Sequence, residues 1–399
     1  MRILQLCNKA PYPANDGSSI AIYNMARGLY ENNAELHLLT INTKKHFKDD
    51  ASVPEEFKNK AHYRSVYKDT SPSALGAFFN LFSSNSYFIS RFYFKEFEDA
   101  LIETLQKNTF DLVQLEGLFM APYIETIRKF SKAKIALRAH NIEHLIWERH
   151  IAHEKNSLKR SYLKIQNARL KKFEEEIFTK VDVIITITDA DKNYILKKFP
   201  KLNIVTCLTG IELKDYEQNA NVKKEENTLF SFGSMDWMPN LEAVDWFVNN
   251  CWKNIHAKHP NCKFIIAGRH MPQKFKTLQL PNIEIIENVS NNRDFYSTYD
   301  IMLVPLLSGS GLRIKLVEGL AYGKAIVSTS IGAEGIVIKK GEQMMLADSA
   351  DEFVNAIDTL LRSETEKKKL EQNAKQFAKE HLENKFITKH LLEYYSKLH

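Results

Sequence analysis

A glycine-rich turn in the second half of the chain has the composition of an anion-binding site. An apolar run over Ile301–Leu307 has the length and residue types of a buried parallel strand. The turn Ser308–Gly311 ends that run, and a helical pattern follows over Leu312–Tyr322, with Gly323 as its expected C-terminal cap. Backbone N–H groups at such a turn bind phosphate, the helix dipole favours it, and glycine lets the anion approach the chain. The stretch therefore predicts a phosphate site at the start of the helix.

Three charged residues near the start of this helix extend the predicted site. Arg313 and Lys315 place positive charge at its mouth, and Glu318 lies further along the same helix. Together with the turn, they indicate a site for a diphosphate that carries a hydroxyl-rich group. The alternative is an ordinary helix surface, because Lys315 and Glu318 are close enough in sequence to pair with each other. The preceding turn favours the binding site.

Polar residues in the first half of the chain also follow predicted strands. His140 stands at the carboxyl end of a strand, where ligands gather in open α/β sheets, and this favours a functional role over that of a core histidine. Asp16 and Gly17 follow the first strand and are predicted to line a cleft, although they could form only a turn. Catalysis by Glu143 or Glu148 is less favoured than a capping or surface role on the helix after His140.

Short apolar strands that alternate with helical segments must position these residues. Such alternation predicts βαβ units and a parallel sheet in each half of the chain, which is the doubly wound α/β class. The first half has predicted strands at Ile3–Cys7, Glu35–Ile41, Asp111–Leu115, Lys134–Arg138 and Val181–Ile187, and a helix at Ile20–Glu31 with Ser18 or Ser19 as its N-cap. The second half has predicted strands at Leu229–Gly233, Lys263–Gly268, Ile283–Ile286, Ile301–Leu307 and Ala325–Thr329.

The length of 399 residues favours two domains. We predict an N-terminal Rossmann-like domain over residues 1–200, a second one over residues 201–380, and a C-terminal helix over residues 381–399 that crosses back to the first domain. The polar stretch Asp215–Asn227 is expected to be a surface connection near the boundary, and Ser363–His399 is expected to be helical throughout.

Composition excludes several classes of protein. No run approaches the roughly 18 apolar residues of a membrane span, and the N-terminus lacks the pattern of a signal peptide. Four cysteines without close pairing indicate neither a zinc site nor a disulfide framework. The net charge of +6 permits an anionic partner without demanding nucleic acid, and none is predicted. We therefore expect a cytoplasmic protein.

Two stretches of the first half allow a second interpretation of the surface. Phe78–Phe97 holds nine aromatic residues, and the long helical pattern over His153–Lys180 begins with the cations Lys155, Lys159, Arg160 and Lys164. The simpler interpretation is an aromatic core beside a solvated basic face. The alternative is peripheral contact with an anionic membrane or a lipid-linked substrate, which would place the protein at the inner face of the membrane.

Several motifs, in order along nearly the whole chain, resemble those of the retaining GT-B glycosyltransferases of family four (group 1). Each motif alone is weak, and their common order makes the resemblance specific. They are Pro11-Tyr12-Pro13 with Asp16-Gly17, Arg138-Ala139-His140-Asn141, Thr186–Ala190, Leu208–Glu212, Phe232–Asn240 and Ser308–Glu318. The resemblance implies the GT-B fold, in which two Rossmann-like domains face each other across a cleft.

The resemblance also implies a role for individual residues of the second domain. The donor, a nucleoside-diphosphate sugar, would lie on Gly233, on the loop with Val289 beside the base, and on the amides of the 308–312 turn; the turn comprises Ser308, Gly309, Ser310, Gly311 and Leu312. Arg313 and Lys315 would neutralise the diphosphate as it leaves, and Glu318 would bind the ribose hydroxyls. One position departs from the family pattern, because Ser310 replaces a glutamate that contacts the transferred sugar.

These observations together predict a retaining, metal-independent glycosyltransferase without a cofactor. It would move a sugar to a saccharide or lipid-linked acceptor on the first domain, in cell-surface polysaccharide synthesis, with His140 orienting the sugar. No carboxylate stands out as a nucleophile, so same-face attack with the leaving phosphate as base is the mechanism that the resemblance implies. The alternatives are a nucleotide-sugar 2-epimerase and a non-catalytic nucleotide-sugar sensor or scaffold. A periplasmic binding protein is disfavoured by the missing signal-peptide pattern.

Overall fold

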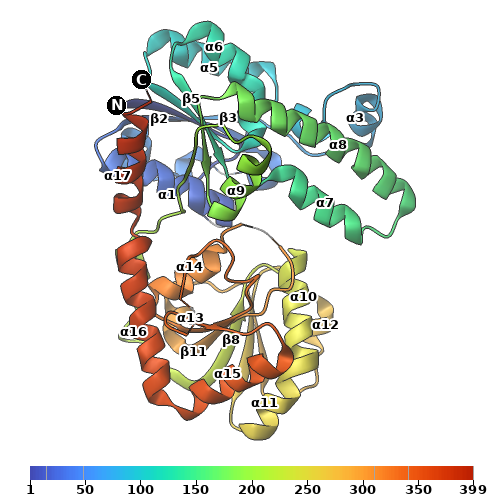
Figure 1. Cartoon of the computed structure of the whole chain (residues 1–399), viewed down its shortest axis with the longest axis vertical. Coiled ribbons are helices and arrows are strands. Elements are labelled where there is room, and N and C mark those ends of the chain that lie inside the picture. Colours follow the sequence, from blue (N-terminus) through green and yellow to red (C-terminus); the bar gives the residue numbers. More distant parts are fainter. Residues whose placement is uncertain (15, 48, 310, 340, 399) are drawn as a thin grey trace. The chain divides into compact units, whose positions relative to one another are not determined.

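The computed structural model describes residues 1–14, 16–47, 49–309, 311–339 and 341–398, which form two compact units. Unit 1 comprises Met1–Gly210 and the C-terminal segment that begins at Asn384, and unit 2 comprises Ile211–Glu383 (Figure 1). The boundary lies after Gly210 rather than after residue 200. Gly210 stays with unit 1 because its carbonyl oxygen accepts a hydrogen bond from Asn24 Nδ2 at 2.7 Å. Both units have sheets covered by helices, as the α/β class requires.

Unit 1 is built on a parallel sheet of seven strands in the order β3-β2-β1-β4-β5-β6-β7. The strands are β1 (Arg2–Cys7), β2 (Glu35–Thr43), β3 (Tyr63–Lys68), β4 (Leu112–Glu116), β5 (Lys134–Ala139), β6 (Val183–Thr186) and β7 (Ile204–Thr206). The strand order reverses between β1 and β4. In open α/β sheets, ligands bind beyond the carboxyl ends of the strands at such a point.

The helices of unit 1 begin and end at positions that partly differ from the prediction. They are α1 (Gly17–Glu31), α2 (Glu55–Lys60), α3 (Ala74–Asn80), α4 (Tyr87–Ser90), α5 (Lys95–Lys107), α6 (Ile124–Phe130), α7 (Glu143–His153), α8 (Ser157–Lys180), α9 (Asp189–Lys198) and α17 (Asn384–Tyr395). The N-cap of α1 is Asp16, because its Oδ1 accepts from the amides of Ser18 and Ser19 at 3.1 Å each. The helical pattern predicted from His153 is broken by residues 154–156, and α8 begins only at Ser157.

The C-terminal segment is two helices rather than one. The first, α16 (Glu364–His381), belongs to unit 2, and the chain leaves the helical conformation before α17 begins at Asn384. Within unit 1, α17 packs against α1: Asn384 Nδ2 donates to the carbonyl of Asn24 at 2.7 Å, and a Cβ at Gly28 would lie 2.4 Å from Thr388 Oγ1. Glycine at position 28 therefore permits the close approach of the two helices.

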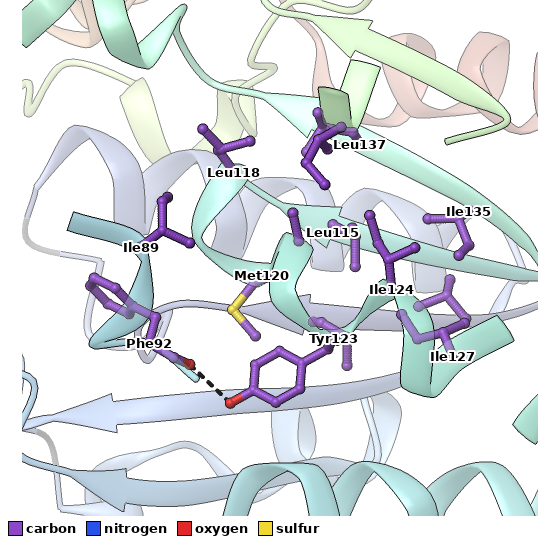
Figure 2. Packing of buried hydrophobic residues seen from close by; sticks show 14 of the residues in the cluster. Ile89, Phe92, Leu115, Leu118, Met120, Tyr123, Ile124, Ile127, Ile135 and Leu137 are labelled. Atoms are coloured by element: carbon purple, nitrogen blue, oxygen red, sulfur yellow. Dashed lines mark hydrogen bonds between the residues drawn. The ribbon is translucent and has the colours of Figure 1, made fainter. Parts of the chain in front are cut away.

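The aromatic stretch divides between the core of unit 1 and its surface. Phe88, Phe92, Phe94 and Phe97 are buried, and Figure 2 shows Phe92 beside Ile89, Met120 and Tyr123. The hydroxyl of Tyr123 donates to the carbonyl of Phe92 at 2.9 Å, which ties this stretch to the core (Figure 2). The core interpretation is thus right for these four rings. It is wrong for four others, because Phe78, Phe79 and Phe82 are 55%, 67% and 82% exposed and Tyr93 is 47% exposed.

Unit 2 is built on a second parallel sheet, of six strands in the order β10-β9-β8-β11-β12-β13. The strands are β8 (Glu225–Phe232), β9 (Lys263–Gly268), β10 (Ile283–Glu287), β11 (Tyr299–Val304), β12 (Ala325–Ser328) and β13 (Met345–Leu346). Since β8 includes residues 225–227, the polar connection expected over Asp215–Asn227 ends before that point. The strand order reverses between β8 and β11.

The helices of unit 2 cover both faces of this sheet. They are α10 (Met238–Phe247), α11 (Lys253–Lys258), α12 (Gln273–Lys276), α13 (Asn292–Thr298), α14 (Ile314–Ala321), α15 (Ala350–Arg362) and α16. The helix predicted from Leu312 begins at Ile314, so that Arg313 is its N-cap. Gly323 follows the helix with a φ of +63°, and its N–H donates to the carbonyl of Leu320 at 3.0 Å, as expected of a C-terminal glycine.

Candidate functional site

Two loops meet where the strand order of unit 2 reverses. The loop after β8 leads into α10, and the loop after β11 leads into α14. Side chains join them: Ser308 Oγ donates to Glu242 Oε2 at 2.9 Å, and Lys315 Nζ donates to Asn240 Oδ1 at 2.6 Å. The structure therefore places Ser308 and Lys315 beside the segment that follows Gly233.

Gly233 is surrounded by other groups rather than left open. A Cβ at Gly233 would lie 2.7 Å from the Asn240 side-chain nitrogen, and the Gly233 N–H donates to the carbonyl of Ala267 at 3.1 Å. Gly268 has a φ of +147°, and a Cβ there would lie 1.7 Å from the carbonyl oxygen of Gly233. The two glycines thus let the ends of β8 and β9 approach each other closely. Contact between Gly233 and a phosphate stays a prediction.

The glycine-rich turn has the backbone conformation that its sequence predicts. Gly309 and Gly311 have φ angles of +115° and +77°, which side chains rarely permit. Ser310 lies outside the described residues. Leu312 is partly exposed, and α14 begins two residues later, with no side-chain cap from Arg313 to its first amides. The N-terminus of α14 can therefore donate backbone N–H groups to an anion.

Arg313 is buried beneath this turn rather than standing at its mouth. Its side chain is 4% exposed, and its guanidinium carbon lies 5.6 Å from the ring centroid of Trp237. Nη2 lies 3.7 Å from Glu334 Oε2 and would be 2.9 Å from a Cβ at Gly309. The positive charge is thus held directly behind the backbone of the turn, where it adds to the potential that attracts an anion.

Lys315 belongs to the site through a residue that the sequence interpretation did not single out. The Asn240 side chain links the two loops, since it accepts from Lys315 Nζ and its Nδ2 donates to the carbonyl of Ser234 at 2.8 Å. Burial, together with the Arg313 charge, lowers the pKa of Lys315 to about 7. The alternative pairing of Lys315 with Glu318 is wrong, because the ammonium group bonds to Asn240 instead. Asn240 could have been found as the last residue of the Phe232–Asn240 motif.

Glu318 faces a group of tyrosines on the inner side of α14. It is 8% exposed, and burial raises the pKa of its carboxyl to about 7, while Tyr296 opposes part of the rise. Tyr296 stacks on Tyr322 with ring centroids 4.5 Å apart, and Tyr216 packs against the edge of Tyr322 at 5.1 Å. The carboxylate therefore has no cationic partner among the described residues, and hydroxyl donors from a ligand would stabilise its charged form.

Val289 lies on the neighbouring loop of the same sheet edge. It follows Asn288, whose φ is +53° and whose N–H donates to the carbonyl of Gly268 at 2.9 Å. Val289 is partly exposed, and α13 begins shortly after it with Asn291 as N-cap. The loop expected to contact a nucleotide base is thus tied to the end of β9.

His140 belongs to a buried charge network in unit 1. Glu116, the last residue of β4, accepts from His140 Nε2 at 2.6 Å and from Arg138 Nη1 at 3.0 Å. Gln5 and Gln114 donate to its other oxygen at 2.7 and 2.6 Å. Burial alone would raise the pKa of Glu116, but Arg138 and His140 hold that pKa at about 2. The sequence interpretation missed Glu116, although a carboxylate that ends an apolar strand at the sheet edge is a usable signal.

Asp16 and Gly17 lie at the same edge of the unit 1 sheet. Asp16 Oδ1 accepts from Lys9 Nζ at 2.6 Å as well as capping α1, which begins at Gly17. The Lys9 charge is also close enough to His140 to help lower the pKa of the imidazole, although burial is the main cause. The structure therefore groups Asp16, Gly17 and His140 around the point where β1 and β4 separate.

Comparison with known proteins connects this geometry to a family. The family described as "Glycosyl transferases group 1" matches residues 226–363, which include the β8–β11 loops and α14. The matched segment lies within unit 2. A protein of Klebsiella pneumoniae named "Uncharacterized 44.6 kDa protein in cps region" is 22% identical to this chain over 398 residues, which are 97% of each chain.

Solved structures show that the whole chain has the GT-B fold. Sucrose-phosphate synthase from Thermosynechococcus elongatus has a TM-score of 0.72 at 14% identity and covers 100% of this chain and 99% of its own. HepE of Anabaena, solved in complex with UDP, has a TM-score of 0.66 at 14% identity and covers 99% of this chain and 100% of its own. The resemblance to group 1 glycosyltransferases of the GT-B fold is therefore confirmed.

Other residues considered for chemistry lie outside the segment that matches the family. Glu143 is the first residue of α7, and burial beside Glu174 raises the pKa of its carboxyl to about 8. Glu148 is exposed further along α7. In the described parts of the chain, one set of metal-ligand types comes together: Glu35, His37 and His62, at the amino end of β2. That is the sheet edge opposite to His140, and metal independence stays a prediction. No helix among the described residues is long and apolar enough to cross a membrane.

Proposed function

We propose that this protein is a retaining glycosyltransferase that moves a sugar from a nucleoside-diphosphate sugar to a saccharide or lipid-linked acceptor. The observation that carries the proposal is the β8–β11 edge of unit 2. There, two glycines of positive φ precede the uncapped start of α14, with Arg313 and Lys315 beside it. The UDP complex of the HepE structure supports a nucleotide donor, and the cps region in the name of the Klebsiella relative supports a role in cell-surface polysaccharide synthesis.

The donor would be recognised by positive charge and by backbone N–H groups at the start of α14. Gly309, Gly311 and the first amides of α14 would bind the diphosphate, and Arg313 would act from behind the turn. The diphosphate would restore the charge of Lys315, whose pKa burial has lowered to about 7. Glu318, whose pKa burial has raised to about 7, would gain hydrogen bonds from the ribose hydroxyls.

We propose same-face displacement as the chemical step. The acceptor oxygen bonds to the anomeric carbon as the bond from that carbon to the diphosphate oxygen breaks, and the acceptor proton passes to the leaving phosphate. The products are a glycoside with retained configuration and a nucleoside diphosphate. Glu116 is a poor candidate for a nucleophile, because it is 1% exposed and accepts hydrogen bonds from four side chains. Stabilising the charge that grows on the leaving diphosphate is then the main task of Arg313 and Lys315.

His140 would orient the transferred sugar through one ring nitrogen. Its pKa is lowered by burial, so the ring is neutral at pH 7, and its Nε2 proton points to the Glu116 carboxylate at 2.6 Å. Nδ1 is then an acceptor, which suits a hydroxyl of a sugar. Glu116 and Arg138 would act as positioning residues for this tautomer.

A panel of UDP-, GDP-, ADP- and dTDP-sugars tests the proposal. We expect one donor to raise the unfolding temperature, because a ligand at 100 times its Kd adds about 2.7 kcal/mol to the free energy of unfolding. The same donor should lose its sugar slowly to water. EDTA should leave both results unchanged. Binding without any sugar release or transfer would favour a sensor or scaffold, and isomerisation of the sugar would favour a 2-epimerase. If no donor of the panel changes the unfolding temperature, the proposal is contradicted.

We also propose that unit 1 contacts an anionic membrane from the cytoplasmic side through α3. Leu75, Phe78, Phe79 and Phe82 are all more than half exposed, and the Phe78 ring lies within 5.8 Å of the other two rings. Arg169 of α8 holds the end of α3, since its Nη1 donates to the carbonyl of Asn80 at 2.9 Å. An apolar surface beside a basic helix suits insertion at the depth of anionic headgroups.

Co-sedimentation with vesicles tests the membrane contact. Wild type should bind vesicles of anionic lipid at low salt and release as salt rises, and binding should weaken in a Phe78→Ser/Phe82→Ser variant. A Phe47→Ser/Phe386→Ser variant, which alters exposed rings elsewhere, is the matched control. If wild type stays in the supernatant with anionic vesicles, a freely diffusing acceptor is the better interpretation.

A further inference from the structure

Helices α7 and α8 of unit 1 line an open groove with a volume of about 500 Å³. They are joined by residues 154–156 and lie side by side (Figure 1). The helical spacing directs residues of α8 toward α7, and residues of α7 toward α8. The polar residues that line the groove are Arg160, Lys164, Asn167 and Lys171 from α8, and His144 and Glu148 from α7.

Hydrogen bonds fix the walls of this α7–α8 groove at both ends. At one end, Glu174 of α8 accepts from His144 Nδ1 at 2.5 Å and from the amide of Glu143 at 2.8 Å, so that it caps α7. At the other end, Arg160 Nε donates to the carbonyl of Glu154 at 2.7 Å. Because both ends are tied, the space between the helices is preformed rather than created by a ligand.

The groove carries a net positive charge, because Arg160, Lys164 and Lys171 outnumber the one carboxylate of its lining, Glu148. Lys164 and Lys171 form no ion pair with any described residue, and Arg160 bonds to a carbonyl oxygen, which carries no formal charge. Residues 157–173 include six lysines and arginines and no acidic residue. Like charges four residues apart on a helix, such as Arg160 and Lys164, repel each other. An anion in the groove would relieve this repulsion.

Asn167 adds a hydrogen-bond acceptor to these cations. Its Oδ1 is buried and has no hydrogen-bond partner among the described residues. A buried carbonyl oxygen without a partner is costly, and a hydroxyl group of a ligand would satisfy it. Cations that attract an acid group, beside an acceptor for a hydroxyl, together fit a sugar that carries an acidic substituent better than a simple inorganic anion.

We propose that the α7–α8 groove binds an anionic saccharide, as a subsite for the acceptor. The proposal rests on the proposed function in naming this ligand as the acceptor, whereas the groove itself is independent of the donor site in unit 2. The loop that carries His140 leads directly into α7, so the groove begins beside the edge of unit 1 to which the sugar is assigned. An acceptor polysaccharide whose sugar residues carry acid groups would thus bind in preference to a neutral polysaccharide.

Calorimetric titration with trigalacturonic acid tests the groove, because this trisaccharide has both carboxylates and free hydroxyls. Wild type should bind it, and neutral maltotriose should not compete. A Lys164→Ala/Lys171→Ala variant should bind at least tenfold more weakly, which is about 1.4 kcal/mol. The matched control is Lys155→Ala/Lys172→Ala, which removes the same charge from exposed residues outside the groove and should change affinity less than twofold.

Asn167→Ala separates the saccharide from a simple anion. It should weaken binding of trigalacturonic acid several-fold and leave any binding of inorganic pyrophosphate unchanged. If both double variants lose the same affinity for trigalacturonic acid, the binding reflects the overall positive charge and not the groove. A wild type that binds no trigalacturonic acid would overturn the proposal. Titration of UDP, GDP, ADP and dTDP into the same preparations keeps the two proposals apart: binding of one nucleotide without binding of the acid sugar refutes the groove alone, and the reverse result refutes the donor site alone.

Discussion

Both units have polar residues at the sheet edge where the strand order reverses, but the two sets of residues differ in how their charges are paired. In unit 1, the carboxylate of Glu116 is surrounded by donors and its pKa is about 2. In unit 2, Lys315 is partly buried and Glu318 is buried, and neither pairs with an opposite charge among the described residues. The pKa of each lies near 7. The Glu116 network is complete without a ligand, whereas a bound diphosphate and ribose would complete the Lys315 and Glu318 site. Under the proposed function, the Glu116 network would therefore position the sugar, and the Lys315 and Glu318 site would bind the nucleotide.

Removing the buried carboxylate should have the largest effect. Glu116→Ala removes the carboxylate that pairs with the Arg138 guanidinium and accepts from three other side chains, and loss of one partner from a buried ion pair costs about 3–5 kcal/mol. Urea unfolding followed by circular dichroism measures this loss. Glu242→Ala is the control, because it removes a carboxylate with a single hydrogen bond to Ser308 and should cost about 1 kcal/mol. If the two variants lose a similar free energy of unfolding, the proposed difference between the two units is wrong.

Loss of the imidazole should separate transfer from nucleotide binding. His140→Ala should lower kcat by about 10²–10³-fold, the usual effect of removing one polar group that stabilises a transition state. The affinity for UDP should stay the same, because His140 belongs to unit 1 and the nucleotide is assigned to unit 2. Both quantities are measured on one preparation. A parallel fall of affinity and turnover would contradict this division of roles.

Loss of the carboxylate in unit 2 should weaken the nucleotide without harming the fold. Glu318→Ala removes hydrogen bonds from the ribose hydroxyls to a charged acceptor, which contribute about 1.5–3 kcal/mol. Calorimetric titration of UDP should therefore show roughly 10- to 150-fold weaker binding. Unlike Glu116→Ala, this variant should unfold at the same urea concentration as wild type. Unchanged affinity would reduce Glu318 to a structural residue of α14.

Proton uptake should reveal the smallest of these effects. With a pKa of about 7, Lys315 is neutral in roughly nine of ten molecules at pH 8, and a bound diphosphate favours its charged form. Binding of UDP at pH 8 should therefore take up close to one proton, which calorimetry measures in buffers of different ionisation enthalpy. At that pH Glu318 is already ionised, since its pKa also lies near 7. Lys315→Met should abolish the uptake, and uptake that persists in this variant would assign it to another group.

The same contrast explains what the sequence could and could not predict. The glycine turn and Glu318 are visible because their spacing belongs to one short stretch of chain, and the buried strands are visible as apolar runs. Glu116 and Asn240 were missed because their partners come from distant segments: Glu116 bonds to Gln5, and Asn240 bonds to Lys315. Burial of a polar residue by tertiary contact leaves no periodic pattern, so the only local signals are the place of Glu116 at a strand end and that of Asn240 in the 232–240 motif.

Weak local patterns account for the other differences. The edge strand β3 alternates exposed and partly buried residues, and β7 is short, so neither has a long apolar run. The break before α8 depends on the hydrogen bond from Arg160 to Glu154, which spacing alone does not indicate. For the same reason, the exposed rings of α3 could be told from the buried rings that follow only once their packing was known.

Hydrogen–deuterium exchange of the full chain with and without UDP tests the central claim most directly. We claim that the nucleotide diphosphate lies on the loops of unit 2 where β8 and β11 separate. UDP should slow exchange in peptides that cover residues 233–240, 288–291 and 311–318, while the network around Glu116 and His140 keeps its exchange rate. UDP that binds without slowing exchange in any of these three segments would contradict the account.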